Sequence, residues 1–153
     1  MVNYSKLSRL LHDLIQINLD RKNAYDEALR EVQDTDHNLR GIFSHLSDQC
    51  KNYVQQLDKE LSKIGVMPDR EHSGFGQLYE SWKDLVSSFL SSRPKSLVDV
   101  FNQSEAATRE IYEDSLLSHH TWNTQVRDII SNQHNEIKTS HEQIKKYCEA
   151  YRK

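Results

Sequence analysis

Apolar residues recur along most of the chain at steps of three and four positions, which is the spacing of one face of an α-helix. The repeat is interrupted at four places, and two of these interruptions contain three of the four glycines and both prolines. The pattern predicts an all-α protein with four long helices and one shorter helix. The predicted helices cover residues 5–33, 37–64, 75–91, 96–117 and 121–151.

Residues at the interruptions predict how several of these helices begin and end. Asp34, Thr35 and Asp36 offer side-chain oxygens to the first free amides of the second helix. Gly65 follows the last apolar position of that helix, where a left-handed C-terminal cap favours glycine. Ser96, with Asp99 three residues later, resembles a capping box built with the shorter acid.

The lengths of the connections predict the topology. Short turns join the first two long helices and the last two, so each pair should run antiparallel. The middle connection, residues 65–95, holds the shorter helix and is long enough to run the length of a bundle. This favours a single domain over 1–153 with the one-crossover topology of a ferritin-like four-helix bundle, and a plain five-helix packing is the alternative.

Composition narrows the range of partners. The formal charge is −3, the pI is about 6.2 and the basic residues are spread along the chain, so we expect neither nucleic-acid nor membrane binding. The first residues have no small-residue cleavage site after an apolar core, which favours a cytoplasmic protein. Cys50 and Cys148 fall in different helices and form no CxxC pair, so we expect two reduced core thiols.

Five segments, in this order and spacing, resemble a family of small bacterial ferritin-like four-helix-bundle proteins catalogued as a domain of unknown function. They are LLHDLIQINLDRKNAYDEAL (10–29), HLSDQCKNYVQQLDKEL (45–61), LYESWKDLVSSF (78–89), SEAATREIYEDSL (104–116) and NQHNEIKTSHEQI (132–144). The resemblance implies a ferritin-like bundle, a bacterial source and no established activity. The family tends to have glycine where this chain has Arg21, Ala24 and Ser104.

Ferritin-like proteins raise the hypothesis of a carboxylate-bridged di-metal site, which needs a glutamate from two helices and a Glu-x-x-His pair from each of the other two. No glutamate in the sequence has a histidine three residues later, so a standard site is not expected, and neither is a cofactor. A degenerate site for iron, manganese or zinc is the alternative. Its metal ligands would be chosen from Asp20, Glu27, Glu105, Glu136 and His141, with Gln49 and Gln133 nearby.

Each of these candidates also has a structural interpretation. Asp20 and Glu27 border the apolar stripe of the first helix, where solvent-facing or ion-paired roles are usual, and Glu136 is expected to pair with a cation. Glu105 is expected to be a buried, hydrogen-bonded carboxylate, and His141 a satisfied packing residue.

Three functional classes follow from these observations. The favoured one is a non-catalytic helical bundle, with a stress-associated role by family analogy alone, because no phosphate loop, nucleophile elbow or HExxH motif occurs. The second is a carboxylate-based metal-binding or ferroxidase-like protein. The third is a helical adaptor that forms a homodimer or binds an unknown protein partner through its aromatic residues. Those aromatic residues are Tyr4, Tyr79, Trp82, Tyr112, Tyr147 and Tyr151.

Overall fold

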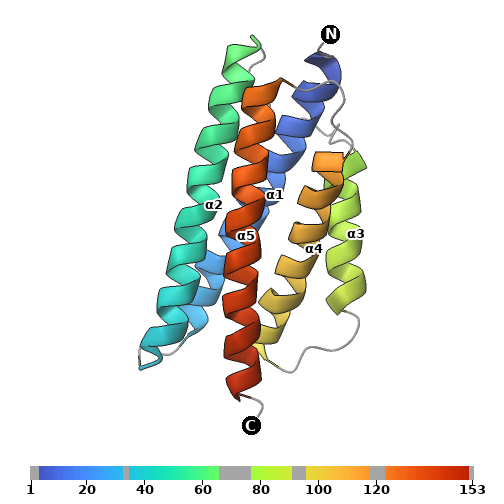
Figure 1. Ribbon diagram of the computed structural model, residues 1–153. Coiled ribbons are helices and arrows are strands. Elements are labelled where there is room, and N and C mark those ends of the chain that lie inside the picture. Colours follow the sequence, from blue (N-terminus) through green and yellow to red (C-terminus); the bar gives the residue numbers. More distant parts are fainter. Residues whose placement is uncertain (1–3, 33–34, 66–76, 91–95, 118–122, 152–153) are drawn as a thin grey trace. The chain divides into compact units, whose positions relative to one another are not determined.

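The computed structural model describes residues 4–32, 35–65, 77–90, 96–117 and 123–151, and within these ranges it is built of helices without strands (Figure 1). This confirms the all-α prediction. The helices are α1 (Tyr4–Glu31), α2 (His37–Lys63), α3 (Gln77–Leu90), α4 (Leu97–Leu117) and α5 (Thr124–Tyr151). The predicted helix positions therefore agree with the structure, with differences of a few residues at the ends.

Local side-chain contacts explain where the helices begin and end. Asp36 accepts a hydrogen bond from the amide of Leu39 at the start of α2, and Ser96 Oγ accepts one from the amide of Asp99 at the start of α4. Gly65 has a positive φ of 79° directly after α2, as predicted.

Two helix ends differ from the prediction. The last helix was predicted to begin at residue 121, but it begins at Thr124, because Asn123 stays outside the helix and its side chain accepts from the amide of Val126. α1 ends at Glu31 instead of at residue 33, and Val32 has already left the helix.

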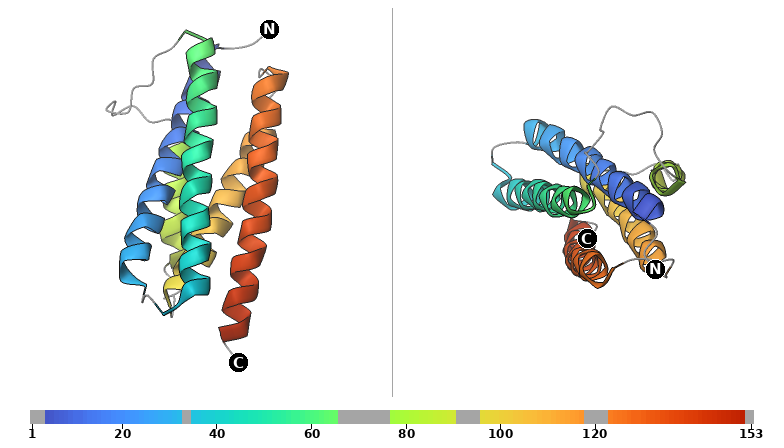
Figure 2. Two further views of the ribbon diagram at one scale, coloured as in Figure 1. Left: turned by 90° about the vertical axis from the view of Figure 1, so that its left-hand side faces the viewer. Right: turned by 90° about the horizontal axis from the view of Figure 1, so that it is seen from above.

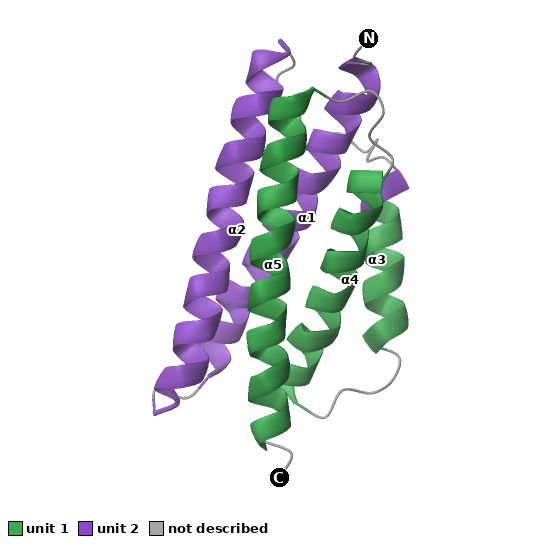
Figure 3. Ribbon diagram, viewed as in Figure 1, with its two compact units in different colours: residues 1–3, 80–153 green, residues 4–79 purple. Residues whose placement is uncertain are grey.

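The described residues divide into two compact units (Figure 3). Tyr4–Tyr79 forms unit 2, which contains α1 and α2, and the described residues from Glu80 onward form unit 1, which contains most of α3 with α4 and α5. The prediction of a single domain and the prediction of a ferritin-like arrangement of the four long helices stay predictions.

Unit 2 is an antiparallel pair of long helices, which both views of Figure 2 show clearly. Leu7, Leu11, Leu14 and Ile17 repeat along one face of α1 and are fully buried, and α2 buries a similar row. The Tyr25 ring of α1 lies with its centroid 5.9 Å from that of Phe43 on α2. Each large apolar side chain buried in this way stabilises the fold by about 1.5–3 kcal/mol.

Beside the connection between these two helices, one arginine contacts the end of α1. Arg40, in the first turn of α2, donates from Nη1 to the carbonyl oxygens of Leu29 and Val32 at 2.9 and 3.2 Å. Carbonyls in the last turn of a helix have no partner within the helix, so the arginine supplies the missing donor.

Unit 1 contains a second antiparallel pair, α4 and α5, with α3 lying beside α4 (Figure 1). Ile111 on α4 and Ile130, Ile137 and Ile144 on α5 are buried, so the apolar stripes seen in the sequence form the core of this unit. Trp82 of α3 is buried and its indole N–H donates to Thr108 Oγ1 of α4 at 3.0 Å. This hydrogen bond holds Trp82, and with it the short helix, against α4.

Two further predictions concern the chain as a whole. No helix among the described residues is both long enough and apolar enough to cross a membrane. Cys50 and Cys148 are both buried and neither is part of a disulfide, in agreement with the expected core thiols.

Candidate functional site

The five candidate metal ligands are divided between the two units. Asp20 and Glu27 lie on α1 in unit 2, whereas Glu105 lies on α4 and Glu136 and His141 lie on α5 in unit 1. Glu27 and Glu136 are exposed and Asp20 is half-buried, while Glu105 and His141 are buried. Within the described parts of the chain, no three His, Cys, Asp or Glu side chains form a group that could hold a metal ion.

In unit 2, Asp20 is held by neutral donors. Tyr79 donates its phenolic hydrogen to Asp20 Oδ2 at 2.5 Å, and Gln16 donates from Nε2 to Oδ1 at 2.8 Å. Both carboxylate oxygens therefore have protein partners. Asp20 occupies the border position that the sequence predicted for it, with hydrogen bonds in place of an ion pair.

The same helix carries a carboxylate that the sequence analysis did not single out. Asp26 accepts a hydrogen bond from Ser47 Oγ of α2 at 2.5 Å, and Lys22 donates to its Oδ2 at 2.6 Å. The hydrogen bond from Lys22, followed by that from Ser47, lowers the pKa of Asp26 below its ordinary value of 3.8, against a smaller desolvation effect. Asp26 thus joins α1 to α2 as a carboxylate.

Gln133 on α5, one of the amides near the hypothetical metal site, has a structural role. Tyr112 on α4 donates its hydroxyl hydrogen to Gln133 Oε1 at 2.7 Å, and both side chains are buried. Tyr112 was one of the aromatic residues proposed for a surface interface, and that assignment is wrong because its side chain faces the interior. Of the same set, Trp82 is also buried, Tyr4 is exposed, and the side chain of Tyr151 lies outside the described residues.

His141 is the centre of a polar cluster between α4 and α5. Arg109 Nη1 lies 3.1 Å from His141 Nδ1, and His141 Nε2 lies 2.9 Å from Asn102 Oδ1. A guanidinium can only donate, so Nδ1 accepts, and the hydrogen of the neutral ring is on Nε2, from which it is donated to Asn102. Both ring nitrogens of His141 are therefore engaged by residues of α4.

The electrostatic surroundings of His141 agree with a neutral ring. Burial is the largest cause that lowers the pKa of His141 below its ordinary value of 6.5, since desolvation penalises the imidazolium. The carboxylate of Glu105 raises the pKa, and the cations of Arg109 and Lys145 lower it. The net direction is downward, so the ring is neutral at physiological pH.

Among the five candidates, Glu105 lies close enough to His141 for their charges to interact. Glu105 is 1% exposed, which confirms that it is a buried carboxylate. Asn102, Glu105 and Arg109 follow one another at steps of three and four along α4, so they share the face that meets His141. That spacing was visible in the sequence, and it could have drawn attention to Asn102 and Arg109.

A buried polar pair on α1 was also missed. Arg21 is 2% exposed and donates from Nη1 to Asn18 Oδ1 at 2.7 Å, while Asn18 Nδ2 donates to the carbonyl of Leu14. The departure from glycine at position 21 was the available signal, because a large cation in place of glycine must find both room and partners.

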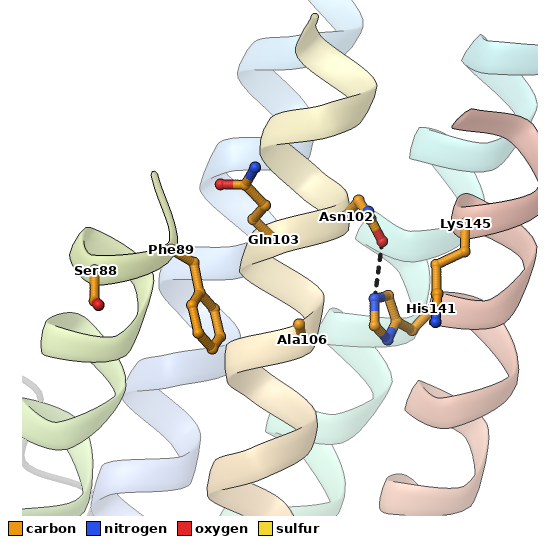
Figure 4. A pocket seen from close by; sticks show the side chains of 7 residues that line it. All are labelled: Ser88, Phe89, Asn102, Gln103, Ala106, His141 and Lys145. Carbon is orange, nitrogen blue, oxygen red and sulfur yellow. Dashed lines mark hydrogen bonds between the residues drawn. The ribbon is translucent and has the colours of Figure 1, made fainter. Parts of the chain in front are cut away.

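A groove in unit 1 opens beside the His141 cluster (Figure 4). Its volume is about 420 Å³, and it crosses α3, α4 and α5. In Figure 4 the Phe89 ring of α3 faces α4, and Ala106 lies on α4 between Phe89 and His141. Asn102 of α4 and His141 of α5 point toward one another. The lining side chains are Ser88, Phe89, Asn102, Gln103, Ala106, His141 and Lys145.

Comparison with known proteins identifies the family. The chain matches the family described as "Domain of unknown function (DUF2383)" over residues 6–118, which is most of its length, and it belongs to that family. No curated protein and no solved structure matches the chain. The matched residues include α1 to α4, whereas α5, which carries His141 and Lys145, follows them.

Proposed function

We propose that this chain is a cytoplasmic, ferritin-like helical-bundle protein that acts by structure or binding, without catalysis and without a standard di-metal centre. The observation that carries the proposal is the state of His141, whose two ring nitrogens are both used by Arg109 and Asn102. A stress-associated role in bacteria belongs to the same proposal and rests on family analogy.

Metal binding at His141 would require a change in this cluster. A metal ion binds a nitrogen lone pair, and the lone pair on Nδ1 already accepts from Arg109. Displacing the guanidinium would cost about 1.5–3 kcal/mol for the lost charged hydrogen bond. The ion would also lie beside the positive charges of Arg109 and Lys145, which repel it.

A carboxylate-based metal site is the second candidate, and the burial of Glu105 favours it. A carboxylate that is 1% exposed needs strong partners, and a metal ion is one kind of partner. In this alternative, Glu105 would supply the central ligand and solvent would complete the coordination of the ion.

Metal analysis of protein purified without a His-tag separates the two candidates. After loading with Fe²⁺, Mn²⁺ or Zn²⁺ and desalting, we expect far less than one ion per chain, measured by inductively coupled plasma mass spectrometry. We expect the same low content in Glu105→Gln, His141→Gln and the control His134→Gln, whose native histidine contacts Glu113 on the α4–α5 surface. Stoichiometric metal that is lost in Glu105→Gln and kept in His134→Gln would establish the second candidate.

A further inference from the structure

The groove of unit 1 has the size of a small-molecule site. Its 420 Å³ falls within the range of about 300–1,000 Å³ that is typical of ligand pockets. Two of its lining side chains, Phe89 and Ala106, offer apolar surface, and the others carry polar groups (Figure 4). This combination of an apolar wall with a few placed polar groups is the usual composition of a binding site.

One end of the groove carries a lysine that forms no salt bridge with a carboxylate of the described chain. Lys145 lines the groove on α5, and among the described residues none forms a salt bridge with its ammonium group. No aspartate or glutamate is among the lining residues. An anionic group of a ligand would therefore meet a cation without a competing negative charge in the lining.

Two amides on α4 define the polar contacts that a ligand could make. Asn102 uses its Oδ1 to accept from His141, which fixes the amide plane and leaves the Nδ2 hydrogens without an acceptor among the described residues. Gln103 Oε1 is shielded from solvent and has no hydrogen-bond donor in the described part of the chain. Because a water-sized group does not reach this oxygen as it is placed, the Gln103 side chain must turn toward the groove to accept from a ligand, and the donor gained in this way offsets the cost of a buried acceptor without a partner.

The opposite wall of the groove is apolar. The Phe89 ring extends from α3 toward α4, and the small side chain of Ala106 leaves space in front of it (Figure 4). An aromatic ring placed there would be in contact with Phe89, in an arrangement that aromatic pairs favour.

We propose that this groove binds a small aromatic carboxylate that also carries a hydroxyl donor. The carboxylate would lie near Lys145 and the Asn102 amide, the ring against Phe89 and Ala106, and the hydroxyl would donate to Gln103 Oε1. This inference goes beyond the proposed function, because it concerns a different set of residues from the metal ligands and requires no metal ion.

The probe for this site is 4-hydroxyphenylacetate, which has all three features. Isothermal titration calorimetry gives the affinity of the probe for the protein. The side-chain amide signals of Asn102 and Gln103 in nitrogen-15 NMR spectra report whether these two residues contact the probe. Three analogues lack one or two of these features. Phenylacetate lacks the hydroxyl donor, tyramine replaces the carboxylate with a cation, and acetate lacks both the ring and the hydroxyl.

The expected result is saturable binding of 4-hydroxyphenylacetate, with weaker binding of phenylacetate and no detectable binding of tyramine or acetate. The Gln103 amide signals should shift more with 4-hydroxyphenylacetate than with phenylacetate. Lys145→Gln should weaken binding on the order of tenfold, since hydrogen bonds to charged groups are the strong ones. Lys146→Gln is the matched control, because Lys146 is the exposed neighbour on α5 that does not line the groove.

The same experiment defines the results that overturn the proposal. Absence of saturable binding at millimolar probe, or equal losses in Lys145→Gln and Lys146→Gln, would contradict it. Tyramine binding as tightly as 4-hydroxyphenylacetate would also contradict it, since Lys145 would then have no role. Far-UV circular dichroism of each variant separates a lost contact from a lost fold. None of these outcomes depends on the metal content of the protein, so the two proposals can fail separately.

Discussion

The α1–α2 contacts of unit 2 rest on ionised, partly exposed groups, whereas the α4–α5 contacts of unit 1 also include hydrogen bonds between neutral, largely buried groups. In unit 2, ionised groups make the contacts described above, Asp26 with Ser47 and Arg40 with the end of α1, and these groups are partly exposed. In unit 1, Tyr112 with Gln133 and His141 with Asn102 join largely buried neutral groups, in addition to the contacts that the ionised Arg109 and Glu113 make with His141 and His134. Unit 2 also holds most of the largest fully buried side chains.

This difference affects what each contact contributes. Water solvates partly exposed charges in the unfolded chain about as well as the protein does in the folded one. Their net contribution to the free energy of unfolding is therefore small, and it depends on the salt concentration. Buried neutral groups cannot return to water when a partner is removed, so their loss leaves an unsatisfied donor or acceptor. Unit 2 should therefore depend mainly on its apolar side chains, and unit 1 more strongly on its hydrogen bonds.

The largest effect is expected from Leu14→Ala in unit 2. The native side chain is fully buried on α1, and its truncation leaves a cavity that the surrounding helices cannot fill. We expect a loss of about 2–5 kcal/mol in the free energy of unfolding, measured by urea denaturation. The control Leu117→Ala removes a leucine that is 76% exposed, and it should change stability by less than about 0.5 kcal/mol. Equal losses in the two variants would show that the buried row on α1 does not carry the stability of unit 2.

The second prediction compares two tyrosine hydroxyls. Tyr112→Phe removes a donor whose acceptor, Gln133, is 1% exposed, and it should cost about 1–3 kcal/mol. Tyr79→Phe removes a donor from Asp20, whose carboxylate is half-buried and can turn to water, so its cost should be smaller. Urea denaturation of the two variants measures both losses. The contrast between the units fails if Tyr79→Phe is the more damaging change.

The smallest predicted effect is a difference in pH dependence. Because burial lowers the folded-state pKa of His141, the unfolded chain binds more protons just below pH 6.5, and stability falls as pH falls through that window. For Asp26 the pKa is lowered from 3.8, so its contribution is kept above that pH and is lost only in stronger acid. Unfolding measured between about pH 7.5 and 5.5 should show a shallower slope in His141→Gln than in the native chain. An unchanged slope would mean that His141 has the same pKa in both states.

Much of the fold followed from periodicity and from residues that favour helix ends. The five helices, the caps at Asp36 and Ser96 and the left-handed Gly65 all depend on interactions within a few residues of the chain, which a sequence displays directly. Asn123 was missed because Trp122 extends the apolar pattern of the last helix to its predicted start, while the competing cap is a single side chain.

The partners of the candidate residues were harder to predict. Burial of Glu105 and His141 followed from their positions on or beside apolar stripes. The contacts of His141 with Asn102 and Arg109 depend on which turn of α4 lies opposite which turn of α5, and periodicity does not fix this register. The same applies to Ser47 and Asp26, which are 21 residues apart, and to the groove, which requires the position of α3 against α4. The arrangement of all four long helices in a ferritin-like bundle stays a prediction.

Arg40 has a consequence for the order in which the protein folds. It binds the last carbonyls of α1 from the first turn of α2, so the two helices are joined across a short stretch of chain. Contacts between residues close in sequence form quickly, because little chain entropy is lost in closing a short loop. During synthesis, this helical hairpin can therefore assemble on the ribosome before the residues of unit 1 have been translated.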